Sequence, residues 1–117
     1  MEIRIEIHTQ DNRLVSDLLG TRRVSVGQQV EMVDGATLTY QGRTGRKAFG
    51  CPVVEPFLLA SATTLTAAAV QAAAKWLWAK LKDRKVDKLV IEGDEISVDE
   101  EEIAQALYKQ IKEAEPR

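Results

Sequence analysis

The chain has 117 residues, 44% of them hydrophobic and 29% charged, and its formal net charge is −2. This length suits one domain, residues 1–117, with its own core, and the lack of a basic block argues against nucleic-acid binding. The single cysteine, Cys51, excludes an intramolecular disulfide. The opening MEIRIEIH lacks the basic and apolar regions of a signal peptide, so we expect a cytoplasmic protein.

The N-terminal residues predict a strand followed by a short helix. Residues 2–8 alternate isoleucine with polar residues, which is the period of a strand with one buried face. Asp11 or Asn12 can cap a helix that ends at Gly20, a residue suited to a left-handed C-cap. The apolar residues of this helix are Leu14, Val15, Leu18 and Leu19.

The next segment predicts further strands. Residues 21–26 favour a short strand with Val24 and Val26 pointing inward. Residues 28–40 favour a hairpin, because the Asp-Gly pair at 34–35 suits a type I′ turn. One face of the hairpin would carry Val30 and Met32 from its first strand, and Leu38 and Tyr40 from its second.

Residues 41–56 are rich in glycine, proline and basic residues, and they predict an exposed loop. Residues 57–83 then predict one long alanine-rich helix, with Pro56 suited to its first turn. The uncharged part of this segment is long enough to span about 30 Å of hydrocarbon. Its alanines and threonines, and a narrow polar strip that includes Thr64 and Gln71, instead favour a helix buried on most sides.

Two tryptophans near the end of this helix raise the question of a partner. Trp76 and Trp78 are two positions apart, so one helix cannot bury both rings against the same surface. We expect Trp76 in the core and Trp78 partly exposed, covered by another element or by a partner protein. The candidate partner-binding residues are Trp78, Gln71, Lys75 and Lys82.

The C-terminal residues predict a second hairpin and a final helix. In residues 88–98 the pair Gly93-Asp94 matches a type II′ turn. Asp99, with Glu102 three residues later, predicts the start of a helix. The apolar stripe of that helix consists of Ile103, Ala104, Leu107, Ile111 and Ala114. Together these elements predict an α+β fold, a small and mostly antiparallel sheet packed by a long central helix and shorter helices, with a ferredoxin-like arrangement as one alternative.

No residue pattern indicates an enzyme, a metal site or a cofactor. His8 is the only histidine and lies on the polar face of the first strand, far in sequence from Cys51. The acidic run at 99–102 fits the start of a helix better than a calcium site, and the glycines at 42–45 match no phosphate-binding motif. The roles of His8 and Cys51 stay open.

The basic loop has two functional interpretations. Arg43, Arg46 and Lys47 could contact an acidic partner, or they could make the loop a protease substrate, since exposed loops of small and polar residues are readily cut. Cleavage within residues 42–50 would separate the first strands from the predicted helix 57–83, which would then be a latent membrane-active segment. In the resting state we expect no membrane insertion.

The C-terminal half resembles a known family. An alanine-rich helix with tryptophans near its end (AAAVQAAAKWLWAKLKDRK) is followed by a hairpin (VDKLVIEGDEISVD) and an amphipathic helix (EEEIAQALYKQIKEA). With the strand MEIRIEI and the short helix after it, this arrangement resembles the effector-associated constant component group, small accessory proteins of bacterial conflict systems. Residues 27–56 have no counterpart in that group. The resemblance implies a non-enzymatic adaptor in anti-phage defence, whose partner is an effector such as a caspase-like or trypsin-like protease. The surface around Trp78 would equally suit a homo-oligomer.

Overall fold

The computed structural model describes residues 2–11, 13–33, 35–43, 53–61 and 65–114. The strands are β1 (Glu2–Thr9), β2 (Gln29–Val33), β3 (Ala36–Tyr40), β4 (Val53–Ser61), β5 (Val86–Ile91) and β6 (Asp94–Ile96). The helices are α1 (Leu14–Leu19), α2 (Ala67–Leu81) and α3 (Glu100–Ala114). Six strands form one sheet in the order β2-β3-β4-β1-β5-β6, and every pairing is antiparallel.

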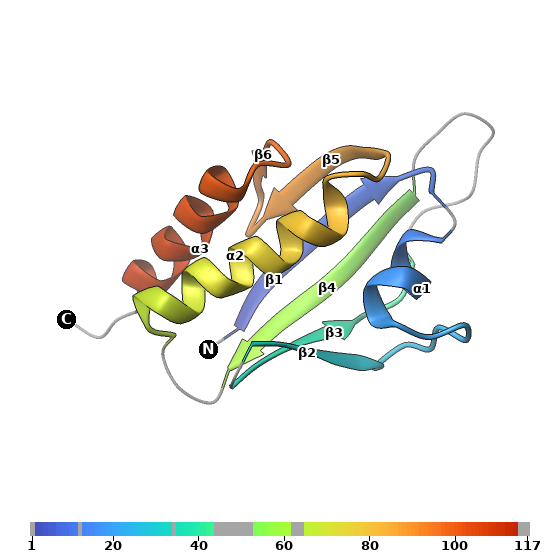
Figure 1. Ribbon diagram of the computed structural model, residues 1–117, viewed down its shortest axis with the longest axis horizontal. Helices are drawn as coiled ribbons and strands as arrows, with labels where there is room; N and C mark the ends of the chain where they lie inside the picture. Colours follow the sequence, from blue (N-terminus) through green and yellow to red (C-terminus); the bar gives the residue numbers. More distant parts are fainter. Residues whose placement is uncertain (1, 12, 34, 44–52, 62–64, 115–117) are drawn as a thin grey trace.

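This arrangement confirms the predicted α+β fold. All three helices lie on the same face of the sheet (Figure 1). The inner strands β3-β4-β1-β5, with α1 after β1 and α2 after β4, follow the strand-helix-strand-strand-helix-strand pattern of a ferredoxin-like unit. Strands β2 and β6 extend the two edges, and α3 packs beside α2.

The core lies between the sheet and the helices and is built in rows across the strands. Tyr40, Phe57, Ile5 and Ile91 are aligned neighbours on β3, β4, β1 and β5, and all four are buried. The same alternation in residues 2–8 that predicted β1 puts Ile3, Ile5 and Ile7 on this inner face. From the helices, the core receives Leu14 and Leu18 of α1, Val70, Leu77 and Leu81 of α2, and Ile103 and Leu107 of α3.

The prediction of one helix over residues 57–83 is wrong for its first part. Residues 53–61 form β4, which is paired on both sides, with β3 and with β1. The loop predicted over 41–56 therefore ends before Val53, and residues 44–52 lie outside the described residues. The helix begins only at Ala67, after Thr66, whose hydroxyl accepts a hydrogen bond from the Ala69 amide at 3.1 Å.

Pro56 lies within β4 without breaking the sheet. Its carbonyl accepts a hydrogen bond from the Gln41 amide at 2.9 Å, so the side of the strand where its N–H would point faces Gln41. That position is just beyond Tyr40, the last residue of β3, which pairs with Phe57. The missing N–H therefore removes one hydrogen bond, the reciprocal bond to the Gln41 carbonyl, at the end of the pairing between β3 and β4, and proline is tolerated there in an interior strand.

Predictions of one turn, one helix cap and one strand are also corrected. The second hairpin turns at Glu92-Gly93, because Ile91 pairs with Asp94, and both turn residues have positive φ (48° and 84°), as a type I′ turn requires. The N-cap position of α1 is Arg13, and Asp11 accepts a hydrogen bond from the Arg13 amide instead of capping the helix; Asn12 is outside the described residues. Residues 21–26 form no strand.

The remaining predicted elements are confirmed. Gly20 ends α1 in the left-handed conformation, with φ of 70°. Strands β2 and β3 form the predicted hairpin, and Met32, Leu38 and Tyr40 are buried. The Asp99 carboxylate accepts a hydrogen bond from the Glu102 amide at 3.1 Å at the start of α3. The stripe from Ile103 to Ile111 is buried, whereas the side chain of Ala114 lies outside the described part of the chain.

Candidate functional site

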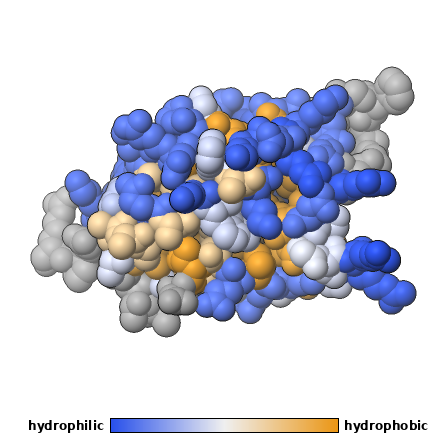
Figure 2. All heavy atoms as spheres, in the orientation of Figure 1, coloured by the Kyte–Doolittle hydropathy of each residue, from blue (hydrophilic) through white to orange (hydrophobic). Residues whose placement is uncertain are grey.

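The outward side of α2 carries alanines and lysines. Five exposed residues follow one line along this side, and we call them the α2 surface: Ala68, Ala72, Lys75, Ala79 and Lys82. They lie opposite the buried stripe that includes Val70 and Leu77, as the helical period requires. Figure 2 shows weakly hydrophobic residues gathered over the first turns of α2. Alanines at such positions let another surface approach the helix closely.

The two tryptophans border the α2 surface on its two sides. Both are partly buried and pack against the core, with the fully buried Leu77 between them. The prediction that Trp76 is the core tryptophan is therefore wrong, whereas a partly exposed Trp78 is confirmed. The Nζ atom of Lys82 lies 4.7 Å from the centre of the Trp78 ring, and that of Lys80 lies 5.5 Å from the centre of a Trp76 ring.

The predicted partner-binding residues share one side of α2. Gln71, Lys75 and Lys82 are exposed beside Trp78. Gln71 also lines a depression of about 510 Å³ between α2 and α3, together with Ala104 and Tyr108 and the acidic residues Asp99, Glu100 and Glu101. The Tyr108 hydroxyl donates a hydrogen bond to the Ala67 carbonyl at 3.0 Å and so fixes α3 beside the start of α2.

A buried carboxylate marks a second location, at the end of β3. The Glu55 side chain is 1% exposed on the inner face of β4, and Arg43 Nε lies 2.8 Å from its Oε1. The Tyr40 hydroxyl is 3.4 Å from both carboxylate oxygens. Burial raises the pKa of Tyr40, and the adjacent Glu55 charge raises it further. The hydrogen bond to Glu55 raises the pKa of Arg43, so the guanidinium stays charged.

This ion pair borders a cavity of about 470 Å³ between α1, residues 22–26 and the sheet. Its lining includes Val15, Arg22, Val24, Val26, Arg43 and Glu55. The prediction that Val24 and Val26 point inward is wrong, since they are 37% and 72% exposed. Of the predicted loop residues, Arg43 has an ion-pair partner inside the domain, while Arg46 and Lys47 lie outside the described residues.

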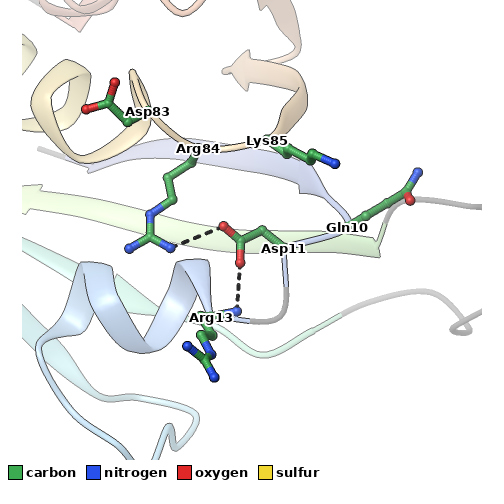
Figure 3. A pocket seen from close by; sticks show the side chains of 6 residues that line it. All are labelled: Gln10, Asp11, Arg13, Asp83, Arg84 and Lys85. Atoms are coloured by element: carbon green, nitrogen blue, oxygen red, sulfur yellow. Dashed lines mark hydrogen bonds and ion pairs between the residues drawn. The ribbon is translucent and has the colours of Figure 1, made fainter.

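A third location is the polar pocket shown in Figure 3, with a volume of about 730 Å³. Its centre is Arg84, whose Nη1 lies 3.3 Å from an Asp11 oxygen and whose Nη2 pairs with Asp17. The Asp11 carboxylate also accepts the Arg13 amide at 2.9 Å. These bonds tie the start of α1 to the connection between α2 and β5, which is a structural role.

Within the described ranges, no three histidine, cysteine or acidic side chains gather as a metal site would require. His8 lies on the outer face of the sheet, opposite Val54 on β4 and Lys88 on β5, and its Nε2 is buried with no hydrogen-bond partner among the described residues. Cys51 is outside the described residues. No described geometry therefore joins these two residues as a nucleophile and base.

Sequence reasoning missed the cavity beside Glu55. The signal was present, since Glu55 occupies an inward position between Val53 and Phe57, but the segment was assigned to a loop. Comparisons of the chain with models of known protein families, with curated proteins and with solved structures found no match.

Proposed function

We propose that this protein is a non-catalytic interaction module that binds an effector through the α2 surface. The observation that carries the proposal is an exposed, alanine-rich helix side bordered by two half-buried tryptophans. Small residues permit close packing against a partner, and tryptophans at the edge supply the large contact area typical of binding hot spots. A core helix with no partner would more commonly expose a strongly charged side.

The charges around the α2 surface suit a protein partner that carries both acidic and basic side chains. Lys75 and Lys82 make the α2 surface positively charged, whereas Glu100 and Glu101 make the neighbouring depression negatively charged. Complementary charges would orient a partner, while the alanines and tryptophans would supply contact area. The family resemblance leads us to propose an effector such as a caspase-like or trypsin-like protease, in the cytoplasm of a bacterium, as part of anti-phage defence.

The alternative of a membrane-active helix over 57–83 is not retained, because residues 57–61 belong to β4. Across the described segments, no helix combines the length and the apolar character that a membrane crossing needs. Cleavage within residues 42–50 would fall between β3 and β4, and β4 pairs with β1 and β3, which both precede the cut. Cutting there would leave the pieces paired in one sheet.

The test is co-expression of the chain with the protein encoded beside it in its genome, followed by size-exclusion chromatography with light scattering. We expect a complex whose mass is the sum of both chains. Ala72→Arg should weaken it at least about 10-fold, because a long charged side chain in place of an alanine blocks close packing on the α2 surface. Glu113→Arg, at an exposed position near the end of α3, is the matched control and should bind normally.

Two outcomes would contradict the proposal. A complex that tolerates Ala72→Arg would place the interface elsewhere. A chain that forms a dimer alone, and loses it on Ala72→Arg, would assign the α2 surface to a second copy instead of an effector.

A further inference from the structure

The cavity beside Glu55 combines an ion pair with exposed apolar side chains. Its lining includes the ion pair between the buried Glu55 carboxylate and the partly exposed Arg43, and its apolar lining comes from Val15, Val24 and Val26. Among the described residues, the exposed large apolar side chains are Val24 and Val26, and both line this cavity. The volume of about 470 Å³ is within the range of small-molecule sites.

The rim of the cavity is held in place by backbone hydrogen bonds to β3. The Gly27 amide donates to the Tyr40 carbonyl at 2.7 Å, and the Tyr40 amide donates to the Gln28 carbonyl at 2.9 Å. Val26 also packs closely on Gly42, where an added Cβ would come within 2.9 Å of its Cγ2 atom. Val26 therefore lies next to a segment that is hydrogen-bonded to β3, and a ligand that binds there loses little entropy in ordering it.

The charges of the lining select the ligand. Arg22 and Arg43 contribute two positive charges and Glu55 one negative charge, which leaves one positive charge. A cation would meet two guanidinium groups, and a doubly charged phosphate would exceed the single charge available. Arg43 uses Nε for Glu55, one of its five N–H donors, so this bond leaves its four terminal donors for an anion.

We propose that this cavity binds a ligand with one carboxylate next to a branched aliphatic group. The carboxylate lies between Arg22 and Arg43, and the aliphatic group covers Val24 and Val26. Two sources share this chemistry, a small aliphatic acid and the C-terminal residue of a peptide. The inference is independent of the α2 surface, since it involves none of its residues.

The test is NMR titration of the full chain with N-acetyl-leucine and, in parallel, with its uncharged amide. We expect saturable shifts of the Ser16, Val24, Val26 and Gly42 amides with the acid, and at least about 10-fold weaker binding of the amide, because charge-assisted hydrogen bonds are lost. A five-residue peptide ending in leucine with a free carboxylate identifies the source. Tighter binding than N-acetyl-leucine indicates a peptide C-terminus, and weaker binding a small acid.

The variant Arg22→Gln should weaken binding of the acid several-fold without loss of folding, since Arg22 is exposed. Arg23→Gln is the matched control, because Arg23 is an exposed arginine next in sequence that does not line the cavity. Equal binding of acid and amide, no saturable shifts with any probe, or equal losses in the two variants would overturn the proposal.

Discussion

Removal of Arg43 should destabilise the protein through the carboxylate that it leaves behind. The Glu55 side chain is 1% exposed, and Tyr40, at 3.4 Å, is its other described side-chain partner. Loss of one partner from a fully buried ion pair costs about 3–5 kcal/mol. Since the Arg43 side chain is 38% exposed, solvent screens part of the interaction, and we expect Arg43→Met to cost about 2 kcal/mol.

The two partners should respond unequally. Glu55→Gln leaves a guanidinium that can turn into water, so its cost should be about 1 kcal/mol. The double variant Arg43→Met/Glu55→Met removes both charges at similar volume and should be more stable than Arg43→Met alone. Urea unfolding followed by tryptophan fluorescence measures all four proteins, because Trp76 and Trp78 are half-buried. If the double variant were no more stable than Arg43→Met, the buried carboxylate would not be the source of the cost.

Three further predictions concern the turn, the ionisation of Tyr40 and the loop. Gly93→Ala should lower the free energy of unfolding by about 1 kcal/mol, measured in urea. The Gly93 φ is 84° and no atom lies within 4 Å of an added Cβ, so the cost comes from backbone strain. An unchanged midpoint of urea unfolding would contradict this cause. Because the pKa of Tyr40 is raised on folding, its stabilising contribution is complete below about pH 10 and is lost as pH rises through the folded pKa. Unfolding in urea between pH 9 and 11 should therefore show a smaller decline for Tyr40→Phe, and equal declines would refute the cause. Cleavage within residues 42–50 should give two bands on a denaturing gel but one peak of unchanged mass in native chromatography, and separation of the pieces would show that β4 is not held by β1 and β3.

Elements with one buried face could be predicted from the sequence. The alternation in β1, the period of α3 and the Asp-Gly turn between β2 and β3 each specify a local structure whose apolar face matches the core. The strand β4 could not be predicted in this way. Its outward residues Val54, Pro56, Leu58 and Ala60 are as apolar as most of its inward ones, so no period of two appears. Because the alanine-rich segment of α2 follows closely, residues 57–61 of β4 read in the sequence as the start of the same helix.

Pro56 also favoured the wrong assignment of residues 57–61 to a helix, because the local preference of proline differs from its position in the sheet. Pro56 next to an apolar run predicts the first turn of a helix. In the sheet the cost is one hydrogen bond from its own nitrogen, lost just beyond Tyr40 at the end of the pairing between β3 and β4. That fact depends on a partner strand, so a local pattern could not contain it.

The cavity beside Glu55 was the least predictable feature, because its residues depart from the rule that apolar side chains are buried and charged ones exposed. An acidic residue occupies an inward position, and two valines lie exposed on an irregular segment. Each departure by itself lowers the stability of the fold, since a buried carboxylate loses its hydration and an exposed valine forgoes the stabilisation that burial would give. Their meeting in one cavity is hard to attribute to packing, which would favour the opposite choice at each position. It is what a ligand with one charged and one apolar end would require.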